Sequence, residues 1–214
     1  MNSLPRKKIG WFRKQLGKIG KRYLRKKYKK MDLYVLSLME LEVMKKYSDL
    51  LGNQKSGLEE LNRQFIQGAN DIFFNLMNYI KIFFSKSLED ILYIYDVAMY
   101  IILGNDYKEF FGKPRLFKAE ETEDGIPKIV TRINKCVMCA SVEEGDIQLQ
   151  ELGDKGFGEI LGNAITALVQ LVQDYVENDY SIVLKETKCF LRGDKYGEFT
   201  MYFYPRPKEE EIDM

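Results

Sequence analysis

Histidine is absent from all 214 residues of the chain. It is the commonest general base, the usual activator of a serine or cysteine nucleophile, and the commonest zinc ligand. Its absence excludes Ser-His-Asp and Cys-His mechanisms. Since no recognisable catalytic or cofactor motif replaces them, we expect a protein that is not an enzyme.

Cysteine and long apolar runs are also scarce. The chain has three Cys, an odd number, and no secretory signal, so a disulfide framework is not expected and a reducing compartment is favoured. No window reaches the roughly 18 uninterrupted apolar residues of a spanning helix. Residues 72–84 and 91–103 come nearest, and polar residues interrupt both, which predicts buried core helices. We expect a cytoplasmic protein, attached peripherally to a membrane.

Acidic residues are missing from the first 30 positions, which carry 13 Lys and Arg. The overall charge of +1 conceals this, because the other 184 residues hold 20 basic against 32 acidic side chains, a balance of −12. A basic segment attracts polyanions such as lipid head groups or nucleic acid, whereas an acidic body repels them. The sequence therefore assigns polyanion binding to the N-terminal segment.

Apolar residues recur every three or four positions in this segment, which predicts one apolar stripe on a helix over residues 6–28. The stripe consists of Ile9, Phe12, Leu16, Ile19 and Tyr23. Three glycines weaken the helix, so we expect it to be loosely ordered in water and helical against a surface that accepts the stripe.

Three interpretations of this helix remain open. A helix lying in an anionic membrane interface is favoured, because phosphate binding alone needs no apolar stripe. Nucleic acid, with Trp11 or Tyr23 stacking on bases, is the second. Docking onto a partner, or onto the acidic body of the chain itself, is the third. The expected contact residues are Lys7, Lys8, Trp11, Phe12, Arg13, Lys14, Lys18, Lys21, Arg22 and Arg25.

The rest of the chain predicts helices first and strands later. Helical periodicity covers residues 32–51, about 56–83 and 88–103, with capping boxes predicted at Ser56 with Glu59 and at Ser87 with Asp90. Strands are expected at 116–121 and 128–133, then a helix at 158–175 and a hairpin from 180–190 and 199–204. This order predicts an α+β fold, with helices packed on one face of a small antiparallel sheet. We divide the chain into a basic amphipathic extension (1–30), a linking helix (31–57), a domain (58–205) and an acidic tail (206–214).

Three features of residues 60–205 carry a family resemblance: the order of elements, a strand leading into Cys136, and the hairpin 184–194 that ends in Glu198-Phe199. The hairpin is similar to a pattern of Glu, two residues, Cys, a Gly-containing turn, Cys, one residue, Phe. On these features the segment resembles the 4-vinyl-reductase domain family, which shares its fold with core subunits of TRAPP tethering complexes. The resemblance implies a homodimer that binds small hydrophobic molecules or builds membrane-tethering assemblies. Vinyl reduction does not follow for members generally.

Cys136 and Cys139 form a C-x-x-C pair, and Cys189 stands in the terminal hairpin. These three are tentative zinc ligands, with Glu186 or another acid as the fourth. The chain departs from zinc-binding members of the family, which have a second Cys where this chain has Gly197 and another before the long helix. The competing interpretations are small buried hydrophobic side chains, which we favour, and a redox pair.

Aromatic residues on the helices are candidates for a hydrophobic pocket, namely Phe73, Phe74, Tyr93 and Phe157. An aromatic stripe at helical spacing is more often ordinary core. The sequence as a whole predicts a non-catalytic dimeric binding or adaptor module, attached to an anionic membrane or a partner through its basic N-terminal helix. The alternative is a sensor domain for a small hydrophobic ligand.

Overall fold

The structure, a computed structural model, describes residues 8–27, 33–136, 138–139, 142–143, 145–152 and 156–207. Its helices are α1 (Trp11–Lys27), α2 (Leu33–Leu51), α3 (Gln54–Ile80), α4 (Leu88–Leu103), α5 (Tyr107–Phe110), α6 (Leu149–Leu152) and α7 (Glu159–Tyr175). Its strands are β1 (Arg115–Phe117), β2 (Lys128–Ile133), β3 (Tyr180–Lys188) and β4 (Gly197–Pro205). Short 3-10 turns include η1 (Lys81–Phe83), η3 (Ala119–Glu121) and η4 (Phe190–Arg192).

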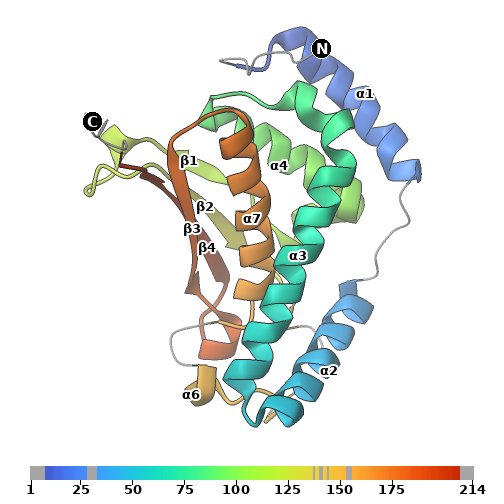
Figure 1. The fold of residues 1–214 in the computed structure, drawn as a ribbon, viewed down its shortest axis with the longest axis vertical. Helices are drawn as coiled ribbons and strands as arrows, with labels where there is room; N and C mark the ends of the chain where they lie inside the picture. Colours follow the sequence, from blue (N-terminus) through green and yellow to red (C-terminus); the bar gives the residue numbers. More distant parts are fainter. Residues whose placement is uncertain are drawn as a thin grey trace, which may run out of the picture.

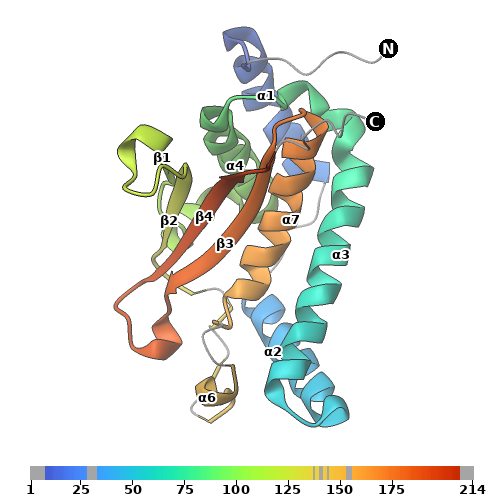
Figure 2. The ribbon, with the colours of Figure 1, turned by 60° about the vertical axis from the view of Figure 1, so that its left-hand side comes forward.

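The four strands form one antiparallel sheet in the order β1-β2-β4-β3. The central strand β4 pairs with β2 on one side, where Met201 lies opposite Ile129, and with β3 on the other, where Met201 lies opposite Leu184. Figure 2 shows β3 and β4 as a long twisted hairpin beside α7. The pairing follows from sequence, because β3 and β4 are consecutive and joined by a turn in which Gly193 has φ of 87°.

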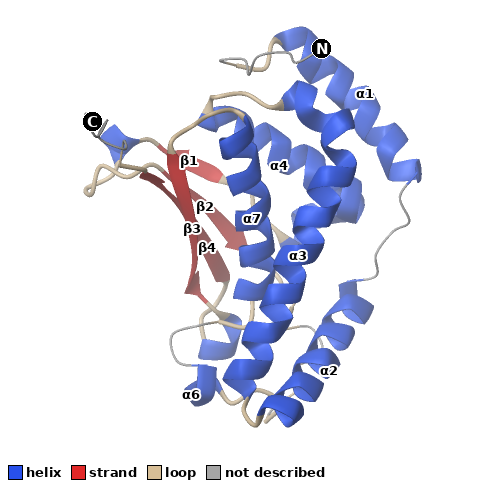
Figure 3. Cartoon of the chain, viewed as in Figure 1, coloured by secondary structure: helices blue, strands red, loops and turns tan. Residues whose placement is uncertain are grey.

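Helices cover one face of this sheet. In Figure 1 the sheet stands at the left, α7 lies against β3, and α3 runs alongside α7. Figure 3 shows the same segregation as red strands on one side and blue helices on the other. The α+β class with helices on one face is therefore confirmed.

The core between sheet and helices is apolar because the strands alternate. Met201 and Phe203 of β4, Ile129 of β2 and Ile182 of β3 pack with Ile91 of α4. Phe203 is completely buried. Burying a side chain of this size contributes roughly 1.5–3 kcal/mol. These inward residues of the strands therefore fix which face of the sheet the helices cover.

A second core lies at the far end of the molecule, where α2 and α3 pack together. Leu41 and Met44 of α2 contact Leu58 of α3, and Phe157 and Ile160 from the beginning of α7 complete the cluster. The predicted linking helix is thus part of the packed body, since its buried residues share a core with α7.

The predicted helix ends differ in their caps. The side chain of Asn53 accepts the backbone N–H of Ser56 at 2.8 Å, so α3 begins one turn before the predicted Ser56 cap. Ser87 caps α4 without a side-chain hydrogen bond. Its partner in the predicted capping box, Asp90, makes other contacts, described below.

The first predicted strand is also shorter than expected. β1 ends at Phe117, and residues 119–121 form η3 instead. The reason is local: the carboxylate of Glu121 accepts the backbone N–H of Lys118 at 2.8 Å, which favours a turn over an extended chain.

Candidate functional site

Helix α1 lies on the outside of α4, at the upper right of Figure 1. The residue before it anchors the contact, since Ile9 is only 6% exposed. The backbone N–H of Ile9 donates to the Asp90 carboxylate at 2.7 Å. The amphipathic extension is therefore packed on the acidic body of the chain, 81 residues away in sequence.

Asp90 is the centre of this contact. Its side chain is 5% exposed and accepts three donors: Ile9 N–H at 2.7 Å, Ser85 Oγ at 2.7 Å and Lys14 Nζ at 2.9 Å. A buried carboxylate is tolerated when its oxygens are hydrogen bonded and its charge is paired. Removing α1 would leave this charge without two of the three donors.

Gly17 explains how closely the two helices approach. A Cβ at this position would collide with the hydroxyl of Tyr93 on α4 and meet the ring of Phe83. The Tyr93 hydroxyl donates to the backbone carbonyl of Lys14 at 2.9 Å. Gly20, by contrast, has open space around it. Of these two glycines, Gly17 is required by the packing.

Ion pairs extend the contact along both ends of α4. Lys21 pairs with Asp96 at 3.2 Å and lies 4.6 Å from the ring centroid of Tyr100. Glu89 pairs with Lys8 at 3.0 Å and with Lys118 at 3.1 Å. Hydrogen bonds from Lys8, then Lys118 and Ser87, lower the pKa of Glu89 to about 2. The basic face of α1 is thus matched to acidic residues of α4.

The apolar stripe of α1 points the other way, because it lies on the opposite side of the helix from Gly17. Trp11 is 75% exposed, Ile19 71%, Tyr23 68% and Phe12 67%, and Leu16 is exposed as well. Lys18 and Arg22 are exposed beside them. Docking therefore leaves a continuous apolar and aromatic strip facing outward.

The structure divides the predicted contact residues of the extension into two groups. Lys8, Lys14 and Lys21 are paired with α4, and Arg13 donates to the carbonyl of Ile82 at 2.8 Å. Trp11, Phe12, Lys18 and Arg22 face outward. Lys7 and the side chain of Arg25 lie outside the described residues.

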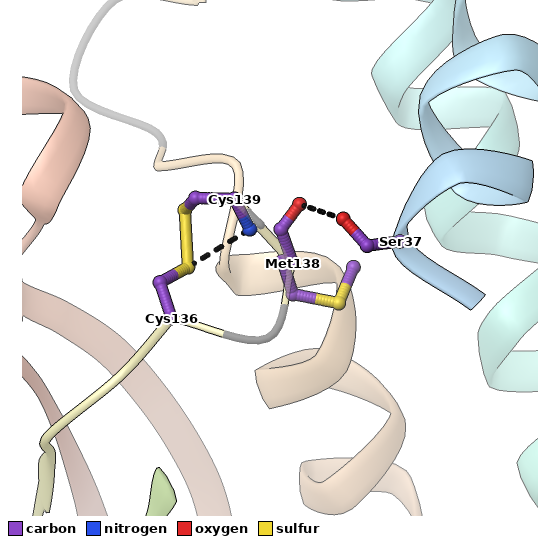
Figure 4. Close-up of a disulfide and its surroundings, with 4 residues drawn as sticks. All are labelled: Ser37, Cys136, Met138 and Cys139. Carbon is purple, nitrogen blue, oxygen red and sulfur yellow. Dashed lines mark hydrogen bonds between the residues drawn. A yellow bond between two sulfur atoms is a disulfide. The ribbon is translucent and has the colours of Figure 1, made fainter. Parts of the chain in front are cut away.

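The structure pairs Cys136 and Cys139 in a disulfide (Figure 4). The sequence-based expectation of no disulfide is therefore wrong for this pair. The turn after β2 places the two Cα atoms 5.2 Å apart, within the usual range for a bridge. The turn is fastened to α2, since Ser37 Oγ donates to the Met138 carbonyl at 2.9 Å.

The tentative zinc ligands are not assembled as a metal site. Two sulfurs in a disulfide are not thiolates, the form that binds zinc, and Cys189 is a free, buried thiol. Within the described part of the chain, no group of three or more His, Cys, Asp or Glu side chains is arranged to hold a metal ion. Zinc binding by the reduced protein stays a prediction, which metal analysis after reduction tests.

Glu186 lies close to Cys189 and at the beginning of α7. Its carboxylate occupies the space that the missing Cβ atoms of Gly156 and Gly158 leave open. Burial raises the pKa of Glu186 to about 7. Burial, then the charge of Glu186, raises the pKa of the Cys189 thiol to about 11. This thiol is therefore protonated and unreactive at neutral pH.

Glu186 and Cys136 also line a common cavity beside Gly158. Its volume is about 10 Å³, which is about the space of one water molecule. The fourth tentative zinc ligand thus lies close to one of the predicted three, but the cavity is too small for an organic ligand.

The structure does not bring the four candidate pocket residues together. Phe157 is completely buried beside α2, whereas Phe73 packs on Phe84 in another cluster. Tyr93 contacts α1, and Phe74 is 62% exposed. A pocket lined by all four is not formed, because they lie on different faces of different helices.

The residues that sequence reasoning missed are the acidic partners on α4. Asp90 was expected to cap its own helix and Asp96 only interrupted an apolar run. Nothing in the local pattern indicates that these carboxylates meet α1, because the contact joins segments 75 to 81 residues apart.

Comparison with known proteins gives one structural likeness. No protein-family model and no curated protein sequence matches the chain. A crystal structure of trafficking protein particle complex subunit 3 from Naegleria fowleri, covalently bound to palmitic acid, is similar to 79% of this chain and 99% of its own chain, with 16% identity and a TM-score of 0.46. None of the described helices is long and apolar enough to span a membrane.

Proposed function

We propose that this chain is a non-catalytic binding module that attaches to an anionic membrane surface through the outward face of α1. One observation carries the proposal: α1 docks on α4 through its glycine and lysine face, so that Trp11, Phe12, Ile19 and Tyr23 point outward. A helix whose apolar face were needed for folding would bury that face. Here the buried face is the polar one.

The composition of the outward face favours a membrane interface. Two of its exposed side chains are the large aromatics Trp11 and Phe12, and Lys18 and Arg22 flank the strip. Each large apolar side chain contributes roughly 1.5–3 kcal/mol when fully transferred out of water. Each basic residue near an anionic surface adds about 1 kcal/mol. Together these terms are sufficient for reversible attachment of a helix lying in the interface.

The other two interpretations of α1 fit this geometry less well. Docking on the acidic body accounts for Gly17, Lys14 and Lys21, but leaves the apolar strip unexplained. Nucleic acid requires cations, and three of the lysines of α1 and its approach are already paired with carboxylates. The strip and the two outward flanking cations match an interface of apolar chains beneath anionic head groups.

The experiment uses the single tryptophan of the chain as its own reporter. Purified full-length protein is mixed with vesicles of phosphatidylcholine alone or with 30% phosphatidylserine (a composition of about one third anionic lipid, in the range that attracts basic helices). We expect a blue shift of Trp11 emission and co-sedimentation only with the anionic vesicles. The double variant Phe12→Ser/Ile19→Ser should lose co-sedimentation.

Leu50→Ser is the matched control, because Leu50 is 80% exposed on α2, away from the strip. It should bind as the unaltered protein does. Unshifted emission with anionic vesicles, or equal loss of binding in the control, would overturn the proposal. Because the altered side chains are exposed, their thermal unfolding should match that of the unaltered protein, which separates lost binding from lost folding.

We also propose the homodimer that the family resemblance implies. Its support is a stripe on α2 that is exposed although apolar: Met39, Val43 and Leu50 are 60%, 40% and 80% exposed and share one side of the helix at spacings of four and seven. Light scattering of the full chain should give twice the mass of one chain, and Leu50→Asp should shift it to one. The sensor alternative stays a prediction that native mass spectrometry tests.

A further inference from the structure

The face of the sheet turned away from the helices is uncovered in both views (Figures 1 and 2). Strand alternation sends Phe199, Met201 and Phe203 of β4 into the core, where all are buried. Tyr202 and Tyr204 consequently point to the open face, where both are half-buried. This open sheet face consists of the outward residues of β1 to β4 and of Tyr196, which precedes β4.

Cations line the open sheet face on three strands. They are Arg115 of β1, Lys128 and Arg132 of β2, and Lys185 and Lys188 of β3. Within the described residues, none of these five lies within ion-pair distance of a carboxylate. Glu198 is the acidic residue among the outward positions of β4, and Thr187 donates to it at 2.8 Å. A domain whose sequence is acidic thus carries a basic face.

Aromatic rings alternate with these cations. Tyr196 lies between Arg132 and Lys188, 4.2 and 4.4 Å from its ring centroid. Tyr202 lies between Lys128 and Lys185, at 6.0 and 5.7 Å. The two sets repeat the same unit, a ring with a cation on each side.

The same arrangement continues at both ends of the face. Arg115 lies 4.7 Å from the ring centroid of Phe117 on β1. The rings of Tyr202 and Tyr204 stack at 5.9 Å with 26° between their planes. Rings and cations therefore extend over β1, β2, β4 and the β3 edge of the sheet.

We propose that the open sheet face binds single-stranded nucleic acid. Unstacked bases place their faces on aromatic rings, and the backbone phosphates meet the neighbouring lysines and arginines. The repeated unit of one ring between two cations supplies both partners at the spacing of adjacent strands, about 4.8 Å. Because the face is flat and its rings lack base-edge donors arranged in a pocket, recognition is of the strand and not of its sequence.

Two other polyanions fit the face less well. An anionic membrane takes up projecting apolar side chains, as α1 offers, but the rings here are half-buried and Val183, 37% exposed, is the one large aliphatic residue among the exposed side chains of the described face. An acidic peptide would use the cations without needing the rings between them. Stacking distinguishes nucleic acid from both.

This site is independent of α1. The helices lie between the open sheet face and α1 (Figure 1), because α4 and α7 cover the inner face of the sheet and α1 packs on α4. Variants of one surface therefore leave the other unaltered, and failure of either proposal does not affect the other.

The test is fluorescence anisotropy of a labelled single-stranded RNA of twelve uridines titrated with full-length protein. We expect binding that weakens with salt, and weaker binding to a duplex of the same length. Lys128→Gln/Lys185→Gln should weaken binding and lower the slope of log affinity against log salt by about two, since each lost phosphate contact lowers it by about one. Tyr202→Leu should weaken binding by roughly tenfold through lost stacking.

Two double variants with the same charge change are the controls. Lys46→Gln/Lys55→Gln alters exposed lysines of α2 and α3, and Lys18→Gln/Arg22→Gln alters α1. Both should leave the affinity unchanged. Absence of binding at 50 mM salt (about the lower end of the range where such contacts are strongest), equal loss in a control, or an unaltered affinity of a folded Tyr202→Leu protein would each overturn the proposal. Circular dichroism establishes that each variant is folded.

Discussion

The buried carboxyl of Glu40 predicts an unusual dependence of stability on pH. Glu40 lies on α2, is 3% exposed, and neither carboxylate oxygen has a hydrogen-bond partner among the described residues. Burial raises its pKa to about 8, against an ordinary value of 4.5. The folded protein therefore binds a proton that the unfolded chain releases near pH 4.5.

Stability falls as pH rises because of this difference in pKa. Below pH 4.5 both states carry the proton, and Glu40 has no effect of charge on stability. As pH rises from 4.5 to 8, the unfolded state ionises and the folded state does not, so the free energy of unfolding falls. At about 1.4 kcal/mol per unit of pKa, the loss is on the order of 3 kcal/mol at pH 7. That is a large share of a typical stability of about 5–15 kcal/mol.

Glu40→Gln removes the ionisation and keeps the shape of the side chain. We expect the variant to match the unaltered protein within about 1 kcal/mol at pH 5 and to exceed it by roughly 3 kcal/mol at pH 7, because only the unaltered protein loses stability between these values. For a chain of this size, that corresponds to a rise in Tm of about 6–12 °C at pH 7. Urea unfolding at both pH values measures the difference.

Glu42→Gln is the matched control, since Glu42 lies on the same helix, is exposed, and pairs with Lys45 at 3.5 Å. Its effect should stay below about 1 kcal/mol at either pH. Glu186, whose pKa is raised to about 7, titrates in the same window, but it does so in every variant and cancels in the comparison. A stability difference between Glu40→Gln and the unaltered protein that stays constant from pH 5 to 7 would refute the reasoning.

Three further predictions concern the packing of α1 and the cysteines. Gly17→Ala should loosen α1 and speed tryptic cleavage within it, because the added Cβ meets Tyr93, whereas Gly20→Ala, with open space around it, should leave cleavage unchanged or slow it; equal cleavage of both variants would contradict the docking. The Cys189 thiol, with its pKa raised to about 11, should not react with a thiol reagent at pH 8 until the protein is unfolded; rapid labelling of the native protein would count against its burial. Alkylation of unreduced protein under denaturing conditions should modify one cysteine, and three after reduction, if Cys136 and Cys139 are bridged; three labels without reduction would show the pair to be free.

Periodicity predicted the elements of this fold well, because it is a local property. The apolar spacing of residues 32–51 and 158–175 corresponds to α2 and α7, and the alternation of 128–133 to β2. The predicted boundaries failed where a side chain bonded to nearby backbone, as at Asn53 and Glu121. Such bonds compete with regular structure over three or four residues and leave little trace in the pattern of apolar positions.

The apolar stripe of α1 was also predicted from its spacing, but its orientation was not. The stripe indicated a face that seeks an apolar environment, and by itself it fits a core as well as an outer surface. The decision rests with Gly17, Lys14 and Asp90, since a missing Cβ and a buried ion pair hold the opposite face against α4.

Charge shows the same division. The sequence determined that the first 30 residues are basic and that the remaining chain has a balance of −12. It did not indicate that Arg115, Lys128, Arg132, Lys185 and Lys188 share one face. Net charge is a sum over the chain, whereas a binding surface depends on strand register, which is set by pairing between β2, β4 and β3.

The sequence by itself therefore determined the class of fold, the spans of its main helices and the amphipathic character of α1, since each follows from neighbouring residues. The tertiary structure decided which face of α1 is buried, where Glu40 lies, and which cations gather on the sheet. These depend on contacts between residues many positions apart, such as Ile9 with Asp90. Such contacts are selected by packing and by the satisfaction of buried polar groups, which act only once the chain has folded.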